Sequence, residues 1–273
     1  MIPIIQKKIS HLFHPLQGEI WCLHRVVPER SDYPSNRELE ITPGYLEVLV
    51  KKYISEGYAF VSIDELIQSK SFLPKKQVNI SFDDGFRDVY TNAFPIFTKY
   101  HIPFTIYLTT DFPERKADIW WIQLEQNRSV KEYEDLMKQI YECEKPMAGI
   151  MHELTGTQPD LELCRSLSLS WKEIQEMVDS GLCTIGSHTV SHPGLTRIEE
   201  DACHRELEES RRIIRERLGR DAFHFSYPHS MENKAVRRAV SEAGFTSATL
   251  GYGGTIRRGD DRFRLNRKYI VQA

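Results

Sequence analysis

The chain has 273 residues, a hydrophobic content of 40%, a charged content of 27% and a formal charge of −3. These values are typical of a folded α/β protein, and they exclude the strongly basic balance of most nucleic-acid-binding domains. We therefore expect no nucleic-acid partner.

The sequence contains no run of about 18 apolar residues and no secretion-type leader, so we expect no membrane span and a cytoplasmic location. The five cysteines are widely spaced and form no CxxC pair, which favours reduced thiols over a disulfide framework. Residues 3–13 could form a short helix or strap, and Lys7 and Lys8 there allow weak association with a membrane surface.

The first half of the chain alternates between strand and helix patterns. "GEIWCLHRV" at 18–26 predicts a buried strand, and a helix with Pro43 in its first turn ends near Gly57. "YAFVSIDEL", "QVNISF" and "PFTIYLTT" predict three further strands, with a helix over 89–100 that is kinked at Pro95. This rhythm indicates βαβ units and a parallel sheet or barrel.

Residues 111–169 contain charged helical stretches and no strand candidate, which indicates a helical insertion. The alternation then resumes with a helix over 170–180 and a strand "LCTIGSH". A helix over 196–218 is expected next, opened by a capping box of Thr196 and Glu199. "AFHFSYP", a helix over 232–243, "TSATL" and "RFRLNRKYI" complete a single domain over 1–273.

Two polar clusters follow predicted strands. Asp83 and Asp84 end "QVNISF" just before Gly85, and His188 and His192 lie in a loop after "LCTIGSH". The carboxyl ends of parallel strands share one face, so the clusters should meet. One carboxylate and two imidazoles can hold a catalytic zinc, which leaves the other carboxylate free to accept a proton.

"SFDDG" and "SHTVSH" resemble the first two motifs of the polysaccharide deacetylases, the NodB-homology family also called carbohydrate esterase family 4. The resemblance covers roughly residues 18–110 and 170–270, and it implies a distorted (β/α) barrel that removes acetyl groups from N-acetylated sugars. It also implies that Asp83 is the catalytic base and that Asp84, His188 and His192 bind one divalent ion. Zinc is the first expectation, with cobalt, nickel or iron as alternatives.

The sequence departs from the family at two motifs. The third motif, Arg-x-Pro-Tyr, falls on residues 226–229 and lacks its arginine, which Arg25, Arg87 or Arg267 could replace. The late Leu-x-His motif, which supplies a general acid, is also absent. Some biofilm-polysaccharide deacetylases resemble a circular permutation that moves this strand to the N-terminus, so His24 is our candidate acid, expected to be protonated in the resting enzyme.

Other residues near these strand ends are candidates for substrate binding. Trp120 and Trp121 could form a sugar-stacking wall, or they could pin the insertion to the barrel. The full set of substrate-binding candidates is Tyr227, Pro228, His229, Trp120, Trp121 and Arg87.

The expected function is a metal-dependent deacetylase that acts on an N-acetylated glycan or a glycan precursor. The alternatives are a catalytically impaired carbohydrate-binding relative and another mononuclear metal hydrolase of C–N bonds. The missing arginine favours the first alternative, whereas the presence of both Asp83 and Asp84 favours an enzyme, because a binding protein does not need a spare base. The oligomeric state stays open.

Overall fold

The structure is a computed structural model that describes residues 16–68 and 76–273. The segment with Lys7 and Lys8 lies outside the described residues. No helix in the described part of the chain is long and apolar enough to cross a membrane. The strands are β1 (Leu16–Leu23), β2 (Arg25–Val26), β3 (Glu40–Ile41), β4 (Ala59–Phe60), β5 (Gln77–Asp84), β6 (Phe104–Leu108), β7 (Cys183–Ser187), β8 (His224–Ser226), β9 (Ser247–Gly253), β10 (Thr255–Arg257) and β11 (Leu265–Tyr269).

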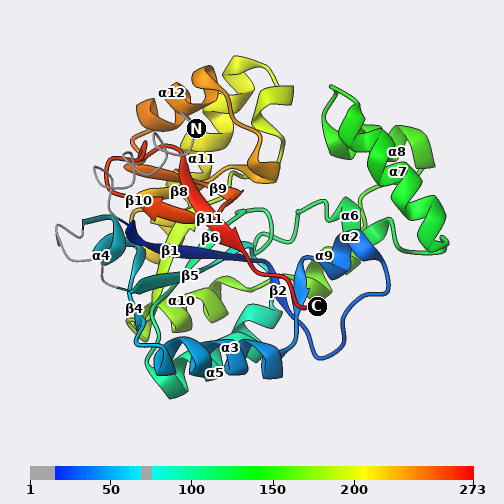
Figure 1. Cartoon of the computed structure of the whole chain (residues 1–273). Coiled ribbons are helices and arrows are strands. Elements are labelled where there is room, and N and C mark those ends of the chain that lie inside the picture. Colours follow the sequence, from blue (N-terminus) through cyan, green and yellow to red (C-terminus); the bar gives the residue numbers. More distant parts are fainter. Residues whose placement is uncertain (1–15, 69–75) are drawn as a thin grey trace, which may run out of the picture.

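A closed barrel forms the centre of the molecule (Figure 1). Within the described residues, seven parallel strands follow each other in the order β1-β11-β9-β8-β7-β6-β5, and β1 pairs again with β5 to close the ring. β4 adds to β5, and β10 pairs antiparallel with β1. The predicted (β/α) barrel is thus confirmed, with the N-terminal strand placed beside the C-terminal one.

Helices cover the outside of the barrel, with α3 and α5 on one side and α11 and α12 on the opposite side (Figure 1). The barrel strands are buried on both faces, as continuous apolar runs such as Phe104–Leu108 require. The helical elements are α2 (Pro34–Arg37), α3 (Pro43–Ser55), α4 (Ile63–Gln68), η1 (Val89–Ala93), α5 (Phe94–Tyr100), α6 (Trp120–Gln123), α7 (Val130–Glu142), α8 (Met147–Thr155), α9 (Leu161–Leu167), α10 (Trp171–Asp179), η2 (Leu195–Arg197), α11 (Glu200–Leu218), η3 (Pro228–Ser230) and α12 (Lys234–Glu242).

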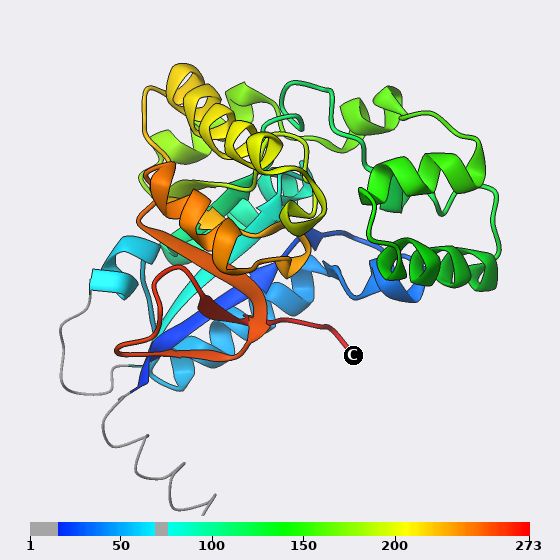
Figure 2. The ribbon, with the colours of Figure 1, turned by 90° about the horizontal axis from the view of Figure 1, so that it is seen from above.

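The insertion lies between β6 and β7, and its helices α7 and α8 stand to one side of the barrel, beside α2 (Figure 2). It has its own apolar core, which includes Trp120 and Tyr133. The segment around α2 fastens it: the hydroxyl of Tyr33 donates to the carbonyl of Arg128 at 2.6 Å, and the buried Asn36 amide donates to the carbonyl of Trp121 at 3.0 Å. The insertion is therefore a fixed wall beside the barrel mouth.

Two local expectations have different outcomes. The kink in the helix over 89–100 is confirmed: η1 is a π-helical turn, and α5 begins at Phe94 with Pro95 in its first turn. The capping box at Thr196 is wrong, because Thr196 lies in the separate turn η2 and α11 begins at Glu200. The guanidinium of Arg197 donates to the carbonyl of Ile140 at 3.1 Å, so η2 follows a tertiary contact with the insertion.

Candidate metal centre and catalytic site

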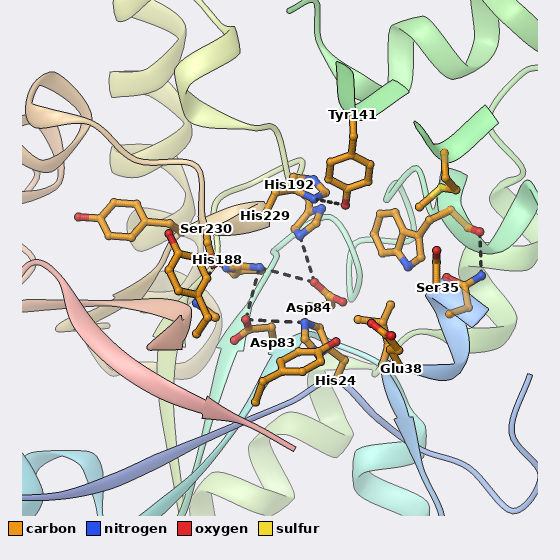
Figure 3. A pocket seen from close by; sticks show the side chains of 18 of the residues that line it. His24, Ser35, Glu38, Asp83, Asp84, Tyr141, His188, His192, His229 and Ser230 are labelled. Carbon is orange, nitrogen blue, oxygen red and sulfur yellow. Dashed lines mark hydrogen bonds and ion pairs between the residues drawn. The ribbon is translucent and has the colours of Figure 1, made fainter. Parts of the chain in front are cut away.

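The candidate residues meet at the carboxyl-terminal mouth of the barrel, around a cavity of about 480 Å³ (Figure 3). His24 follows β1, the two aspartates end β5, and His188 follows β7. His192 lies four residues further along the loop after β7. The structure therefore brings together all five residues that the sequence analysis assigned to metal binding and catalysis.

A sharp backbone turn lets both aspartates serve one site. Asp84 has a φ of 75° and Gly85 a φ of 141°, both in the left-handed half of conformational space. A Cβ atom on Gly85 would lie 2.9 Å from the Cδ1 of Leu108, so only glycine fits there without movement. Asp83 and Asp84 are 3% and 2% exposed, and such buried acids need cationic or hydrogen-bonding partners.

Asp84, His188 and His192 form the candidate metal site. The Oδ1 atom of Asp84 lies 3.2 Å from Nε2 of His192 and 3.6 Å from Nε2 of His188. The Nδ1 atom of His188 lies 2.7 Å from the backbone carbonyl of Ser226, to which it must donate. Its Nε2 atom therefore presents a lone pair to the carboxylate when the imidazole is neutral.

The charge states of these groups fit a cation. Burial lowers the pKa of His188 to about 4, so its imidazole is neutral near pH 7. Burial alone would raise the pKa of Asp84, but the neighbouring histidines outweigh it and hold that pKa below its ordinary value. The buried Oδ1 of Asp84 accepts no hydrogen bond within the described part of the chain. Lone pairs that face each other in a buried site are what a divalent ion would bridge.

The two histidines lie in a loop, as expected from the proline and glycine that follow them. His192 has a φ of 64°, and its backbone N–H donates to the hydroxyl of Thr189 at 3.0 Å. Glu206 on α11 accepts from the backbone N–H groups of Val190 at 2.8 Å and Ser191 at 3.0 Å. These bonds hold the loop in the conformation that brings the histidines together.

Of the three candidate arginines, Arg267 on β11 is the one that pairs with Asp83. Its Nη1 and Nη2 atoms donate to the two oxygens of Asp83 at 2.7 and 2.5 Å, and its side chain is buried. Ser226, which stands where the family motif has arginine, accepts a hydrogen bond from the same guanidinium at 2.9 Å. Asp83 is thus paired with an arginine from another strand, which also bonds the serine at the motif position.

A second group of possible ligands, Cys22, His24 and Asp83, does not fit a metal. Both oxygens of Asp83 are occupied by Arg267. Burial raises the pKa of the Cys22 thiol far above its ordinary value, so the thiolate that a metal would need is not available. Asp83 is therefore left as the free carboxylate beside the Asp84 site.

His24 lies near Asp83, with its Nε2 atom 4.0 Å from Oδ2 of that residue. Burial lowers its pKa, and the attraction of Asp84 and Asp83 does not offset this effect. The expectation that His24 is protonated in the resting site is therefore wrong. Its imidazole is neutral at rest and must gain a proton before it can donate one.

The substrate-binding candidates are only partly brought together. Tyr227 and His229 line the cavity, but the hydroxyl of Tyr227 donates to the carbonyl of Phe263 at 2.8 Å and not to the cavity. Pro228 is buried and does not line the cavity. Arg87 also lies outside it, because its guanidinium pairs with Glu173 on α10 at 2.7 Å.

The two adjacent tryptophans border the cavity, but they belong to the core of the insertion. Trp120 is 2% exposed and Trp121 is 5% exposed, which leaves too little ring surface for a sugar-stacking wall. Their side chains pack with Phe112 and Tyr133. Of the two alternatives, this burial supports the one in which the pair pins the insertion to the barrel, and not the stacking wall.

Sequence reasoning missed several residues that also line the cavity, among them Tyr141, Ser35, Asn36, Glu38 and Leu39. Tyr141 is near the end of α7, and its hydroxyl lies 3.1 Å from Nδ1 of His229. No sequence signal marks this residue, because one tyrosine on an amphipathic helix reads as an ordinary packing residue. Its position depends on how the insertion folds back over the barrel mouth.

Replacing His188 by alanine should remove the metal. We expect about one equivalent of a divalent ion in the parent protein and almost none in His188→Ala after dialysis, because a buried ligand is lost. Metal analysis of the purified proteins measures this. His204→Ala, which changes a histidine on α11, is the matched control and should keep the metal. Equal metal contents in parent and His188→Ala would place the ion elsewhere.

Replacing Arg267 by methionine should lower the free energy of unfolding by about 3–5 kcal/mol, because Asp83 would be a buried charge without a partner. Burial alone would raise the pKa of Asp83, but the charge of Arg267 and the neighbouring imidazoles outweigh it and hold that pKa below its ordinary value. The contribution of the pair is therefore present above the pH at which an unfolded aspartate ionises, and it is lost as the pH falls.

Chemical denaturation at neutral and acidic pH measures this effect. The double variant Asp83→Asn/Arg267→Met removes both charges and should recover part of the lost stability. A loss below about 1 kcal/mol in Arg267→Met at neutral pH would show that the ion pair does not stabilise the barrel.

The sequence profile of the polysaccharide deacetylases matches residues 70–248. Among curated proteins, a poly-beta-1,6-N-acetyl-D-glucosamine N-deacetylase of Staphylococcus epidermidis is 44% identical over 54 residues, which cover 19% of each chain. A protein of the same name from Staphylococcus aureus is 31% identical over 83 residues, or 29% of each chain. The matched segments thus span less than a third of these relatives.

Solved structures resemble nearly the whole chain. The Streptococcus pyogenes deacetylase PplD in complex with acetate has a TM-score of 0.68 at 20% identity, covering 93% of this chain and 92% of that one. IcaB from Ammonifex degensii has a TM-score of 0.66 at 22% identity, covering 93% and 91%. At these identities the likeness is one of fold. Since the profile match covers more than half of the sequence, the chain belongs to the polysaccharide deacetylase family.

Proposed function

We propose that the protein is a metal-dependent hydrolase that removes acetyl groups from an N-acetylated sugar in a polysaccharide or glycan precursor. The observation that carries the proposal is the pairing of two differently held carboxylates: Asp84 faces two imidazoles, and Asp83 is held by Arg267 beside them. The names of the two staphylococcal relatives make poly-β-1,6-N-acetyl-D-glucosamine the first substrate to test.

Asp84, His188 and His192 would hold the ion, with zinc as the first candidate. A divalent ion bound there would polarise the acetyl carbonyl and lower the pKa of water from about 15.7 towards about 7. The other contributions come from the chain itself. Arg267 fixes the direction of the Asp83 carboxylate.

Asp83 would accept the proton from the attacking water, whose oxygen forms a bond to the acetyl carbon. The pKa of Asp83 lies below its ordinary value, so Asp83 passes a proton on readily. His24, 4.0 Å away and neutral at rest, is placed to take that proton and to donate it to the sugar nitrogen as the C–N bond breaks. The second proton of the water leaves on the carboxyl group, so the products are acetic acid and a free amino sugar, and no other reactant is needed.

The experiments below also distinguish two alternative functions. An impaired carbohydrate-binding relative would bind sugar without releasing acetate, and another C–N hydrolase would act on amides without a sugar ring. The presence of Arg267 against Asp83 supports the enzyme, because it supplies the feature that motif three seemed to lack. The cytoplasmic location stays a prediction.

Changing Asp83 to asparagine should lower acetate release by at least about 10²-fold while the metal stays bound, because proton transfer is lost and the three ligands are kept. Acetate is measured with oligomers of N-acetylglucosamine and with nucleotide- and lipid-linked N-acetyl sugars. Asp84→Asn is the comparison variant, and it should lose both metal and activity. If the metal-loaded parent released no acetate from any of these substrates, the proposed function would be wrong.

Changing His24 to alanine should lower kcat by at least about 10²-fold in folded protein that keeps its metal. His24→Gln retains hydrogen bonding but cannot carry the proton, so it should be equally slow. Steady-state rates, corrected for metal content and folded fraction, make the comparison. A kcat within about threefold of the parent in either variant would assign the proton donor to another group.

A further inference from the structure

We propose that Tyr141, which the insertion brings to the cavity, is a specificity-determining residue whose hydroxyl binds a ring hydroxyl of the sugar. His229 is the positioning residue that holds this phenol. The inference rests on the proposed function, since it names the part of the substrate that the insertion contacts.

The main chain around Tyr141 is clamped to the barrel side of the cavity. Arg197 in η2 donates to the carbonyl of Ile140 at 3.1 Å and to that of Tyr141 at 2.6 Å. This turn follows the loop that carries His188 and His192, so the end of α7 is tied to the segment that supplies two ligands. Tyr141 therefore has a fixed position relative to the metal site.

The side chain of Tyr141 is also held at its polar end. Figure 3 shows it reaching towards His192 and His229 from the insertion side of the cavity, and its hydroxyl lies 3.1 Å from Nδ1 of His229. The His229 ring is centred 4.6 Å from that of His192. The phenol thus stands beside the ligand set, and Tyr141 lines the cavity that a substrate would enter.

His229, which contacts the hydroxyl of Tyr141, has an unusual backbone conformation. His229 and Ser230 have φ values of 55° and 56°, a region that non-glycine residues seldom adopt. Two bonds hold the turn: the N–H of Ser230 donates to the carbonyl of Tyr227 at 2.9 Å, and the Ser230 hydroxyl accepts from the N–H of Gly251 at 2.7 Å. Such strain is characteristic of functional positions.

The chemistry of the phenol suits a sugar hydroxyl. A tyrosine hydroxyl can donate one hydrogen bond and accept others, so the contact with His229 leaves it capacity for a second partner. A sugar hydroxyl can also donate and accept. The phenol and a sugar hydroxyl can therefore form a hydrogen bond whether the phenol donates to His229 or accepts from it. Among the described residues, the insertion contributes Trp120, Trp121, Met137 and Tyr141 to the cavity lining, and Tyr141 carries the one hydroxyl.

The test compares the hydrolysis of two substrates at the same site, one with a sugar ring and one without. An N-acetylglucosamine oligomer has the ring hydroxyl, and 4-nitrophenyl acetate has an acetyl group without a sugar ring. Tyr141→Phe should raise KM for the oligomer about three- to tenfold, with kcat within about twofold, and should leave ester hydrolysis by the metal-loaded protein unchanged. Rates of the metal-stripped protein are subtracted, and metal content is measured for each variant.

His229→Ala and the double variant complete the cycle. Because His229 acts by holding Tyr141, adding Tyr141→Phe to His229→Ala should change KM for the oligomer by less than about twofold. Tyr90→Phe, which removes a phenol hydroxyl that bonds Glu176 away from the cavity, is the control and should match the parent. Calorimetry measures the affinity for a glucosamine oligomer, the product, independently of turnover. This affinity should be lower in Tyr141→Phe than in the parent.

Several results would overturn the inference while the proposed function stands. These are an unchanged KM and product affinity in Tyr141→Phe, an equal loss on both substrates, a loss in kcat alone, or additive effects in the double variant. A parent protein that releases no acetate from the oligomer would instead overturn the proposed function, and the inference with it.

Discussion

The ion pair between Arg267 and Asp83 is the interaction on which the site depends. It joins β11 to β5, the two strands that flank β1, and both side chains are almost completely buried. The removal of two charges from water is costly, and the pair is acceptable only because every donor finds an oxygen: Arg267 also bonds the carbonyl of Leu250 and the hydroxyls of Ser81 and Ser226. The geometry of Asp83 is thereby fixed.

This pairing separates two neighbouring carboxylates that would otherwise repel each other. Asp83 has its charge balanced by a guanidinium, whereas Asp84 faces two imidazoles, of which that of His188 is neutral. A cation is therefore favoured at Asp84 and not at Asp83. The different charge environments explain how adjacent residues of one strand end can take the roles of metal ligand and proton acceptor.

The barrel supplies the reactive groups, and the insertion supplies a wall. The rings of Trp120 and Trp121 are buried in the contact between the two, and the carbonyls near the end of α7 are tied to Arg197. The insertion is fixed by its buried core and by the bonds at the end of α7, so it can hold a side chain at a fixed distance from the metal ligands. Substrate recognition can therefore change with the insertion while the strand ends keep their chemistry.

From the sequence alone, strand periodicity indicated a parallel sheet or barrel with an insertion and placed Asp83 and His188 at the same end of parallel strands. The barrel type and the candidacy of His24 came from the resemblance to the family. Three features depended on the tertiary structure. The choice of Arg267 among three arginines needed the closure of β11 against β1, which brings distant residues into contact. The neutral state of His24 depends on burial. The position of Tyr141 depends on how a helix far along the chain packs over the cavity, and no local pattern encodes that packing.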